Sequence, residues 1–290
     1  LQFRAPKATF NMKQKTIYCY KTEFIDVADA RIYPDSMKVI IRKKAFIEPL
    51  ENSKIVANYI TKYHTFTSAT TQITARRNYV AKGIYPYYDA DSLLTELTMS
   101  SIAVDSAFQT VAMGKVENAA GFKLSKQFDY YGAIKIKAAS PLIYFNGATR
   151  INHECEKFPK NWMSFAAQID PKNIQIPVSQ QLKTLDGDAI AAGIVWRDAR
   201  TKDSIRLYPT FLSSLENVND PMLITASGLL QYDFKSKEYQ IASKEKLADR
   251  NAVGNFLALH TESCSLNGDG VINLGMDYGP ITIEAVGTVS

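Results

Sequence analysis

The sequence predicts an almost wholly β protein built from many short strands, and three observations lead to this fold class. Polar and apolar residues alternate through most of the stretch 16–116, as expected for strands with one buried face. Turn-forming residues interrupt this alternation repeatedly. The 16 Tyr and 14 Phe far outnumber the 2 Trp, and Tyr and Phe favour pleated, half-buried surfaces. With 290 residues, 46% of them hydrophobic, the chain can bury a sizeable core.

The clearest alternation lies in the first half of the chain. A helical period of 3.6 residues is absent there, so we expect strands separated by turns at 34–36, 49–52, Gly83 and Pro86. The segments with the strongest two-residue period are 24–32, 38–42, 46–48 and 54–57.

Alanines in the first half recur at a fixed interval. Ala45, Ala57, Ala69 and Ala81 are each separated by twelve residues. A small residue repeated once per rung is typical of a β-solenoid. We therefore expect residues 1–118 to form one domain of alternating strands, arranged as a solenoid-like stack or as an ordinary meander or jelly roll.

The alternation pauses at 117–121, and we place a domain boundary after residue 118. Residues 119–290 are expected to form a β-sandwich-like or jelly-roll-like domain, because strand patterns recur there at short, regular spacing. A short helix is expected within 244–255. The expected strands are 128–137, 142–151, 162–169, 174–178, 190–197, 205–211, a hairpin within 223–241 that turns near 235–237, and a final strand at 281–286.

Charge and hydropathy exclude several classes of protein. The net charge of +5 is compatible with a weak affinity for anionic surfaces, but it does not provide the clustered basic face that nucleic-acid binding requires. The longest basic cluster, Arg42-Lys43-Lys44, is expected inside an alternating strand, as a solvated edge rather than a phosphate site. No apolar run approaches the roughly 20 residues of a membrane-spanning helix. The first residues include neither an initiator Met nor a signal-peptide core, so we expect an interior segment or a processed chain.

Two His and two Cys form the most interesting pairs of side chains: His153 with Cys155, and His260 with Cys264. Together they could bind zinc, although this spacing is unusual for zinc ligands. A Cys155–Cys264 disulfide is more attractive, because it would close a loop of roughly a hundred residues and stabilise the fold by about 4–5 kcal/mol. That bond requires an oxidising compartment and leaves Cys19 without a partner. Three reduced cysteines are the remaining alternative.

Other motifs give little support to catalysis. Residues 266–273 are similar to the middle of an EF-hand loop, but Ser265 and Met276 stand where calcium needs carboxylates, so we expect a simple turn. No Gly-x-Ser-x-Gly, Walker A, dinucleotide-binding or His-Glu-x-x-His motif occurs. We therefore expect no catalytic residue and no cofactor.

Aromatic side chains could form a ligand-binding surface. Successive residues of a strand point to opposite faces, so at least one of each neighbouring pair is expected in the core. The candidates for binding a glycan or a peptide are Tyr85, Tyr87, Tyr88, Trp162 and Trp196.

Two segments carry a resemblance to known proteins. Residues 25–35 and 165–178 resemble stretches of very large, uncharacterised cell-envelope proteins of Bacteroidota, and the similarity extends through most of the chain. The resemblance implies an exported protein in the periplasm or at the cell surface of a Gram-negative bacterium. The first half is also similar to the β-jelly-roll repeats of lipopolysaccharide-transport (OstA-like) proteins, which conduct lipid along an apolar groove.

Three functions follow as expectations. The first is a non-enzymatic envelope protein with a structural or partner-binding role, its partners being other envelope proteins or the rest of a larger polypeptide. The second is lipid or glycan carriage along an open β face, which requires Val39, Ile41, Ile55 and Phe66 to line an uncovered groove. The third is a carbohydrate-active enzyme, which requires two carboxylates within roughly 5–10 Å in a cleft.

Overall fold

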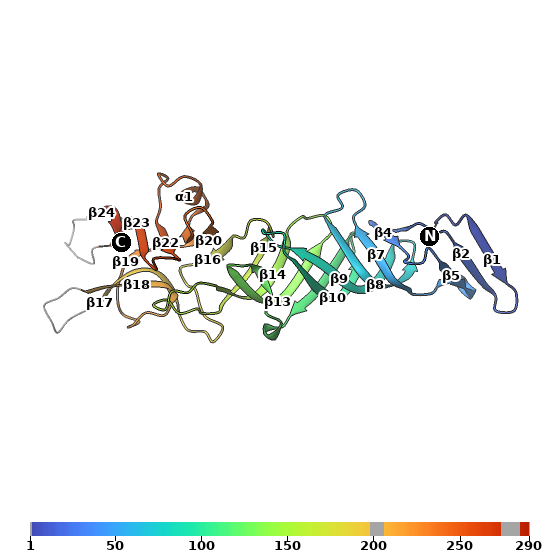
Figure 1. Cartoon of the computed structure of the whole chain (residues 1–290), viewed down its shortest axis with the longest axis horizontal. Helices are drawn as coiled ribbons and strands as arrows, with labels where there is room; N and C mark the ends of the chain where they lie inside the picture. The colour runs from blue at the N-terminus through green and yellow to red at the C-terminus, as the bar shows by residue number, and fades with distance from the viewer. Residues whose placement is uncertain (1, 198–205, 274–284, 290) are drawn as a thin grey trace. The chain divides into compact units, whose positions relative to one another are not determined.

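The computed structural model describes residues 2–197, 206–273 and 285–289, and it confirms the all-β fold class (Figure 1). The described residues contain one short α-helix, α1 (Lys244–Ala248), within the segment where a helix was expected. Two single 3₁₀ turns lie at Lys43–Ala45 and Asn118–Ala120. No helix of the described residues is long and apolar enough to cross a membrane.

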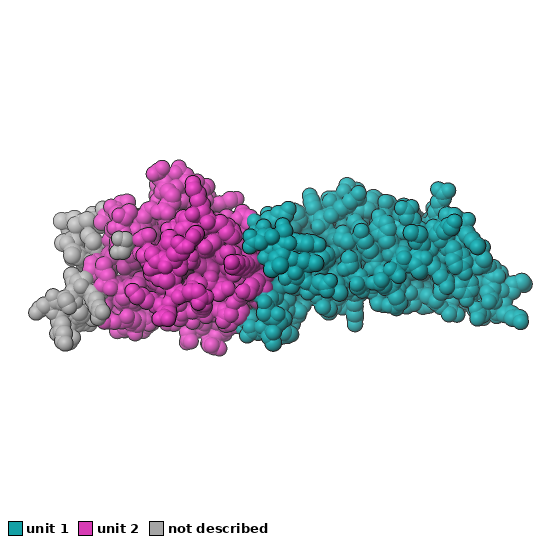
Figure 2. Space-filling model, viewed as in Figure 1, with its two compact units in different colours: residues 1–122, 131–146, 168–172 teal, residues 123–130, 147–167, 173–290 magenta. Residues whose placement is uncertain are grey.

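The chain divides into two compact units (Figure 2). Unit 1 contains residues 1–122, 131–146 and 168–172, and unit 2 contains residues 123–130, 147–167 and 173–290. The boundary expected after residue 118 lies near the end of the first segment of unit 1. Two later segments, 131–146 and 168–172, also belong to that unit.

The largest sheet is a curled antiparallel meander whose strands follow one another almost in chain order. Its alanines do not stack as solenoid rungs, because Ala57 faces His64 and Ala69 faces Ser53 across antiparallel neighbours. The arrangement is therefore the meander among the expected alternatives. Its strands are β3 (Ile25–Val27), β4 (Ala30–Tyr33), β7 (Leu50–Ala57), β8 (His64–Ala75), β9 (Asn78–Tyr88), β10 (Leu94–Val104), β11 (Thr110–Val116), β12 (Lys123–Ser125), β13 (Phe128–Lys137), β14 (Ile143–Ile151) and β15 (Met163–Ile169).

Apolar side chains fill the inner face of this sheet within unit 1. Ile55, Phe66 and Met99 are all 0% exposed, and the Tyr87 ring contacts Phe122 edge-on. Alternate residues of each strand supply this core, which is why the sequence shows a two-residue period. The hydrophobic core is therefore the interior of the curl.

Buried His64, at the start of β8, contacts both strand β9 and the turn between β13 and β14. His64, which is 2% exposed, has its Nε2 at 2.6 Å from the Ser140 carbonyl oxygen and its Nδ1 at 3.0 Å from the Tyr85 hydroxyl. Burial lowers the pKa of His64, so this side chain is neutral and its ring donates to Ser140 and accepts from Tyr85. These bonds attach the start of β8 to the turn between β13 and β14.

A second, four-stranded sheet lies at the N-terminal side of unit 1, in the order β1 (Lys7–Asn11), β2 (Thr16–Tyr20), β5 (Val39–Arg42) and β6 (Phe46–Ile47). The expectation that Arg42-Lys43-Lys44 lies inside a strand is wrong. Strand β5 ends at Arg42, and Lys43–Ala45 forms a 3₁₀ turn in which Lys44 and Ala45 have φ of 60° and 57°. The turn contains no Gly or Pro, so the sequence carries no signal of this chain reversal.

Unit 2 contains two further sheets. One is six-stranded, with β16 (Ile176–Val178), β20 (Gly228–Asp233), β21 (Glu238–Ala242), β22 (Phe256–His260), β23 (Leu266–Ile272) and β24 (Ala285–Val289). The other is three-stranded, with β18 (Arg206–Ser213), β17 (Ala191–Arg197) and β19 (Met222–Thr225). The sheets approach closely at Gly268, where an added Cβ would lie 3.1 Å from a methyl carbon of Ile224. This packing is sandwich-like. Residues 281–284 of the expected final strand lie outside the described residues.

The Asn-Gly-Asp-Gly string is not the turn that we expected. It lies inside β23, where Gly268 is opposite Leu257 and Asp269 is opposite Phe256. The Asp269 carboxylate is paired with Lys246 at 3.0 Å and with Arg250 at 3.0 Å. These ion pairs attach helix α1 and the loop after it to the sheet, so the aspartate has a structural role.

Candidate functional site

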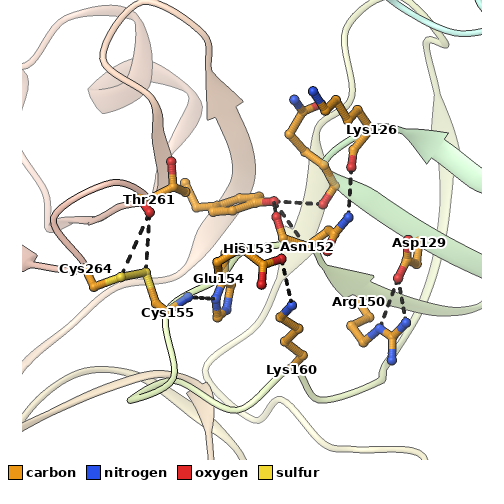
Figure 3. Close-up of polar contacts among 12 residues, drawn as sticks. Lys126, Asp129, Arg150, Asn152, His153, Glu154, Cys155, Lys160, Thr261 and Cys264 are labelled. Atoms are coloured by element: carbon orange, nitrogen blue, oxygen red, sulfur yellow. Dashed lines mark hydrogen bonds and ion pairs between the residues drawn. A yellow bond between two sulfur atoms is a disulfide. The ribbon is translucent and has the colours of Figure 1, made fainter.

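The cysteine pair singled out in the sequence lies within unit 2, and Figure 3 shows both residues with their neighbours. Cys155 follows β14, Cys264 lies in the turn between β22 and β23, and a disulfide joins them across a sequence separation of 109 residues. Cys155 is 2% exposed. The Cys155 side of the disulfide is therefore buried, and the bond joins the segment after β14 to the β22–β23 hairpin.

His153 is buried beside this disulfide, with 3% of its surface exposed. Its Nδ1 accepts a hydrogen bond from the Cys155 backbone N–H at 3.1 Å, and its Nε2 has no partner among the described residues. Burial lowers the pKa of His153, and the positive charge of Lys160 lowers it further, against the smaller opposing effect of Glu154. The imidazole is therefore neutral, with its proton on Nε2.

Tyr239 lies beside His153, with 6.3 Å between the two ring centroids. Its hydroxyl lies 2.6 Å from the Asn152 carbonyl oxygen and 2.9 Å from that of Gln127, and it accepts a hydrogen bond from the Asn152 N–H at 3.1 Å. Its ring is fully buried, and burial raises the pKa of the phenol. Disulfide, imidazole and phenol thus form one buried structural cluster.

This cluster does not have the chemistry of a zinc site. Zinc binds thiolate sulfur, whereas the two sulfurs of Cys155 and Cys264 are bonded to each other. The Nδ1 atom of His260 contacts Ser263 instead, at 3.1 Å from its backbone nitrogen and 3.0 Å from its hydroxyl. Among the residues that the structure describes, no group of three His, Cys, Asp or Glu could hold a metal ion.

The candidate aromatics fall into two groups. Tyr87 is 1% exposed and belongs to the core, while Tyr88, the next residue of β9, is 53% exposed. The half-buried Tyr85 is oriented by His64. In unit 2, Trp162 lies beneath the Arg150 guanidinium at 4.5 Å, and the Trp196 indole N–H donates to the Asn273 carbonyl at 3.1 Å. Four of the five side chains therefore already have structural partners.

One cavity of about 260 Å³ in unit 1 contains three carboxylates, the feature that a glycosidase requires. Each carboxylate is already bonded to a protein side chain. Asp35 accepts from the Asn52 amide at 3.0 Å, Glu51 accepts from the Thr70 hydroxyl at 2.6 Å, and Glu48 pairs with Arg42. These contacts stabilise the turns and strands that carry the three carboxylates.

The four-stranded sheet carries a surface that the sequence analysis did not identify. Phe10, Ile17, Ile41 and Ile47 lie directly opposite one another on β1, β2, β5 and β6, so they form one row across a single face. Exposure increases along the row, from 5% at Ile47 and half-buried Ile41 to 38% at Ile17 and 60% at Phe10. The row therefore begins in the core and ends as exposed apolar surface.

Lysines lie in two turns of this four-stranded sheet, Lys13 and Lys15 between β1 and β2 and Lys43 and Lys44 between β5 and β6. The β1–β2 turn and the β5–β6 turn lie at the same end of the sheet, because β2 and β5 are antiparallel and Ile17 is opposite Ile41. Both turns carry exposed lysines, none of which pairs with a carboxylate of the described residues. We call this end the basic apolar tip; it consists of Phe10, Met12, Lys13, Lys15, Lys43, Lys44 and Phe46.

The sequence does contain a signal for the tip. Residues 7–22 and 36–47 include no Asp or Glu, in a chain that has 29 of them. The eight basic residues of these two segments are Lys7, Lys13, Lys15, Lys21, Lys38, Arg42, Lys43 and Lys44. Pairing of β2 with β5 brings the two segments together, and their positive charges are therefore concentrated in one sheet.

The chain was also compared with known proteins. No protein-family model, no curated protein and no solved structure matches it. A proposal of function therefore depends on the residues and on their geometry. Of the surfaces described above, the basic apolar tip is the one that combines large exposed apolar side chains with charges lacking internal partners.

Proposed function

We propose that this chain belongs to a non-enzymatic, exported envelope protein that acts by binding a partner, and that the basic apolar tip is its binding surface. The observation that carries this proposal is the exposed apolar row of the four-stranded sheet, with Phe10 at 60% and Ile17 at 38% exposure. Exposed apolar patches rimmed by polar residues mark interaction sites.

The open edge of the sheet supports the same proposal. Among the described strands β1 pairs with β2 alone, and its residues Lys7, Ala8, Thr9 and Phe10 are exposed on both faces. Met12 at the adjoining turn is 79% exposed. Leaving these groups in water stabilises nothing in the folded chain, whereas contact with a partner would remove them from water.

The disulfide supports the exported location. A bond between Cys155 and Cys264 persists in oxidising compartments such as the periplasm or the cell exterior, and thiols are kept reduced in the cytosol.

The alternative functions receive less support. Carriage along the first half requires Val39, Ile41, Ile55 and Phe66 to line an open groove. Ile41 is half-buried, but Val39, Ile55 and Phe66 are 0% exposed. Enzymatic hydrolysis of a glycan requires available carboxylates, and those of the acidic cavity are engaged with Asn52, Thr70 and Arg42.

A co-sedimentation assay tests the proposal. The chain is mixed with washed envelope membranes of a Gram-negative bacterium, and the bound fraction is measured against protein concentration. The double variant Phe10→Ser, Met12→Ser should bind at least about tenfold more weakly, because it removes the exposed apolar groups.

A matched control removes equally exposed apolar groups elsewhere. Val218 and Val253 in unit 2 are 80% and 95% exposed, so Val218→Ser, Val253→Ser should bind as the unchanged chain does. Equal binding by the tip variant and the unchanged chain would refute the proposal.

A further inference from the structure

We propose that the partner of the basic apolar tip is an anionic lipid surface, an inference that rests on the proposed function and specifies its partner. The tip unites two properties that interfacial binding needs, namely cations for lipid headgroups and apolar side chains for the acyl boundary. Both come from turns at one end of a sheet.

Four lysines supply the positive charge of the tip. Lys13, Lys15, Lys43 and Lys44 are exposed, and the two segments that carry them contain no acidic residue. Near an anionic membrane each such lysine raises affinity about fivefold. Lys38 lies over the rings of Tyr18 and Tyr20, at 5.2 and 6.0 Å, on the face opposite the apolar row, and it lines the same cavity as the three carboxylates described above, so its charge is not counted in the tip.

Apolar side chains are interspersed with those lysines. Phe10, Met12 and Phe46 are 60%, 79% and 49% exposed. Lysine can extend its ammonium group to the headgroups while its methylene chain and the neighbouring phenyl rings enter the interface. A site for a soluble anion alone would not need the exposed phenyl and thioether groups.

The shape of the β1–β2 hairpin favours lipid over a folded protein. Strand β1 is exposed on both faces, and the hairpin extends from the rest of unit 1 (Figure 1). A folded partner would cover one face or the edge, whereas a fluid interface surrounds an inserted tip on both sides.

The turn itself is ordered without using the lysines. The Asn11 side-chain oxygen accepts from the Gln14 N–H at 3.0 Å, and the Tyr18 hydroxyl donates to the Gln14 side-chain oxygen at 2.9 Å. Thr16 donates to the Gln14 carbonyl at 3.1 Å. Met12, Lys13 and Lys15 therefore remain exposed on a fixed turn, so the backbone of the turn loses little conformational entropy on binding.

Vesicle binding tests the inference. The full chain is titrated with vesicles of phosphatidylcholine alone and of equal parts phosphatidylcholine and phosphatidylglycerol. We expect binding to the mixed vesicles only, weakening as salt is raised. Replacing all four tip lysines by glutamine should weaken binding by at least about a hundredfold.

The charge control changes four lysines elsewhere to glutamine: Lys157, Lys172, Lys235 and Lys244, all exposed. This variant has the same net charge as the tip variant and should retain binding close to that of the unchanged chain. A second readout is Phe10→Trp, whose indole emission should shift to shorter wavelength on mixed vesicles.

The outcomes separate the inference from the proposed function. Failure to bind mixed vesicles, with envelope sedimentation still dependent on Phe10 and Met12, would overturn the lipid inference and leave a protein partner. Equal binding to phosphatidylcholine alone, or an equal loss in the charge control, would also overturn it. If the tip variants bound as the unchanged chain does in both the vesicle titration and the envelope sedimentation, the inference and the proposed function would both be refuted.

Discussion

The Asp29 carboxylate accepts hydrogen bonds from both the backbone N–H and the hydroxyl of Thr110. The N–H lies 3.0 Å from each carboxylate oxygen, and the hydroxyl lies 2.6 Å from Oδ1. Asp29 occupies the β3–β4 turn and Thr110 begins β11, with strands β7 to β10 between β4 and β11 in the sheet. Because the Thr110 hydroxyl donates to Asp29, it accepts from the Tyr79 hydroxyl at 2.7 Å. This chain of bonds joins parts of the meander that are distant in strand order.

Replacing Asp29 by alanine should lower the free energy of unfolding of unit 1 by about 2–3 kcal/mol. The variant leaves the N–H and hydroxyl of Thr110, a residue only 1% exposed, without their charged acceptor. Urea denaturation followed by circular dichroism gives the measurement. Asp26→Ala is the control, since Asp26 is 42% exposed and its ion pair with Arg31 should contribute under about 1 kcal/mol. Equal losses in the two variants would contradict this assignment.

Phe66→Ala should destabilise unit 1 by about 3–5 kcal/mol, because the ring is 0% exposed and its removal leaves a cavity. Val80→Ala on the outer face, where Val80 is 47% exposed, should cost far less. The same urea titration measures both. A small loss at Phe66 together with uptake of a lipid probe would revive the carriage alternative, because it would show that the inner face is open.

Reduction of the disulfide should lower the stability of unit 2 by about 4–5 kcal/mol, the chain-entropy value for a loop of this length. Trp162 and Trp196 are the only two tryptophans of the chain and both belong to unit 2, so indole fluorescence follows its unfolding. The Cys155→Ala, Cys264→Ala variant should be insensitive to reductant, and Cys19→Ala should respond as the unchanged chain does. Detection of three free thiols in chain purified from an oxidising compartment would contradict the pairing.

Acidification should weaken unit 2 through His153. Its pKa lies below the ordinary value of 6.5 because of burial, so the unfolded chain binds the proton more readily. The stability contributed by the neutral imidazole is therefore complete above pH 6.5 and is lost as the pH falls through the folded-state pKa. His153→Asn should flatten this pH dependence while its side-chain oxygen still accepts from the Cys155 N–H. Titration of the imidazole C2–H by NMR measures the pKa directly, and a value above 6.5 would contradict the prediction.

The sequence by itself determined which faces are buried and where most strands lie. A strand exposes alternate side chains to opposite faces, so a one-sided core leaves a two-residue period that can be seen without coordinates. Residues 128–137 were expected as one strand and form β13 with the same bounds. The period fails at turns that lack Gly or Pro, such as Lys43–Ala45. The expected turns at Gly83 and Pro86 are wrong because both residues lie inside β9, and the Asn-Gly-Asp-Gly string lies inside β23.

Only the tertiary structure decided which distant residues meet. Strand alternation is the same for a solenoid, a meander and a sandwich, and pairing alone made the first sheet a meander. The basic apolar tip exists because antiparallel pairing of β2 with β5 brings Lys13 and Lys15 to the same end as Lys43 and Lys44. The hydrogen bonds between Asp29 and Thr110 likewise join residues that are far apart in sequence and in strand order. Such contacts span tens of residues, and the period of a single strand carries no information about its neighbours.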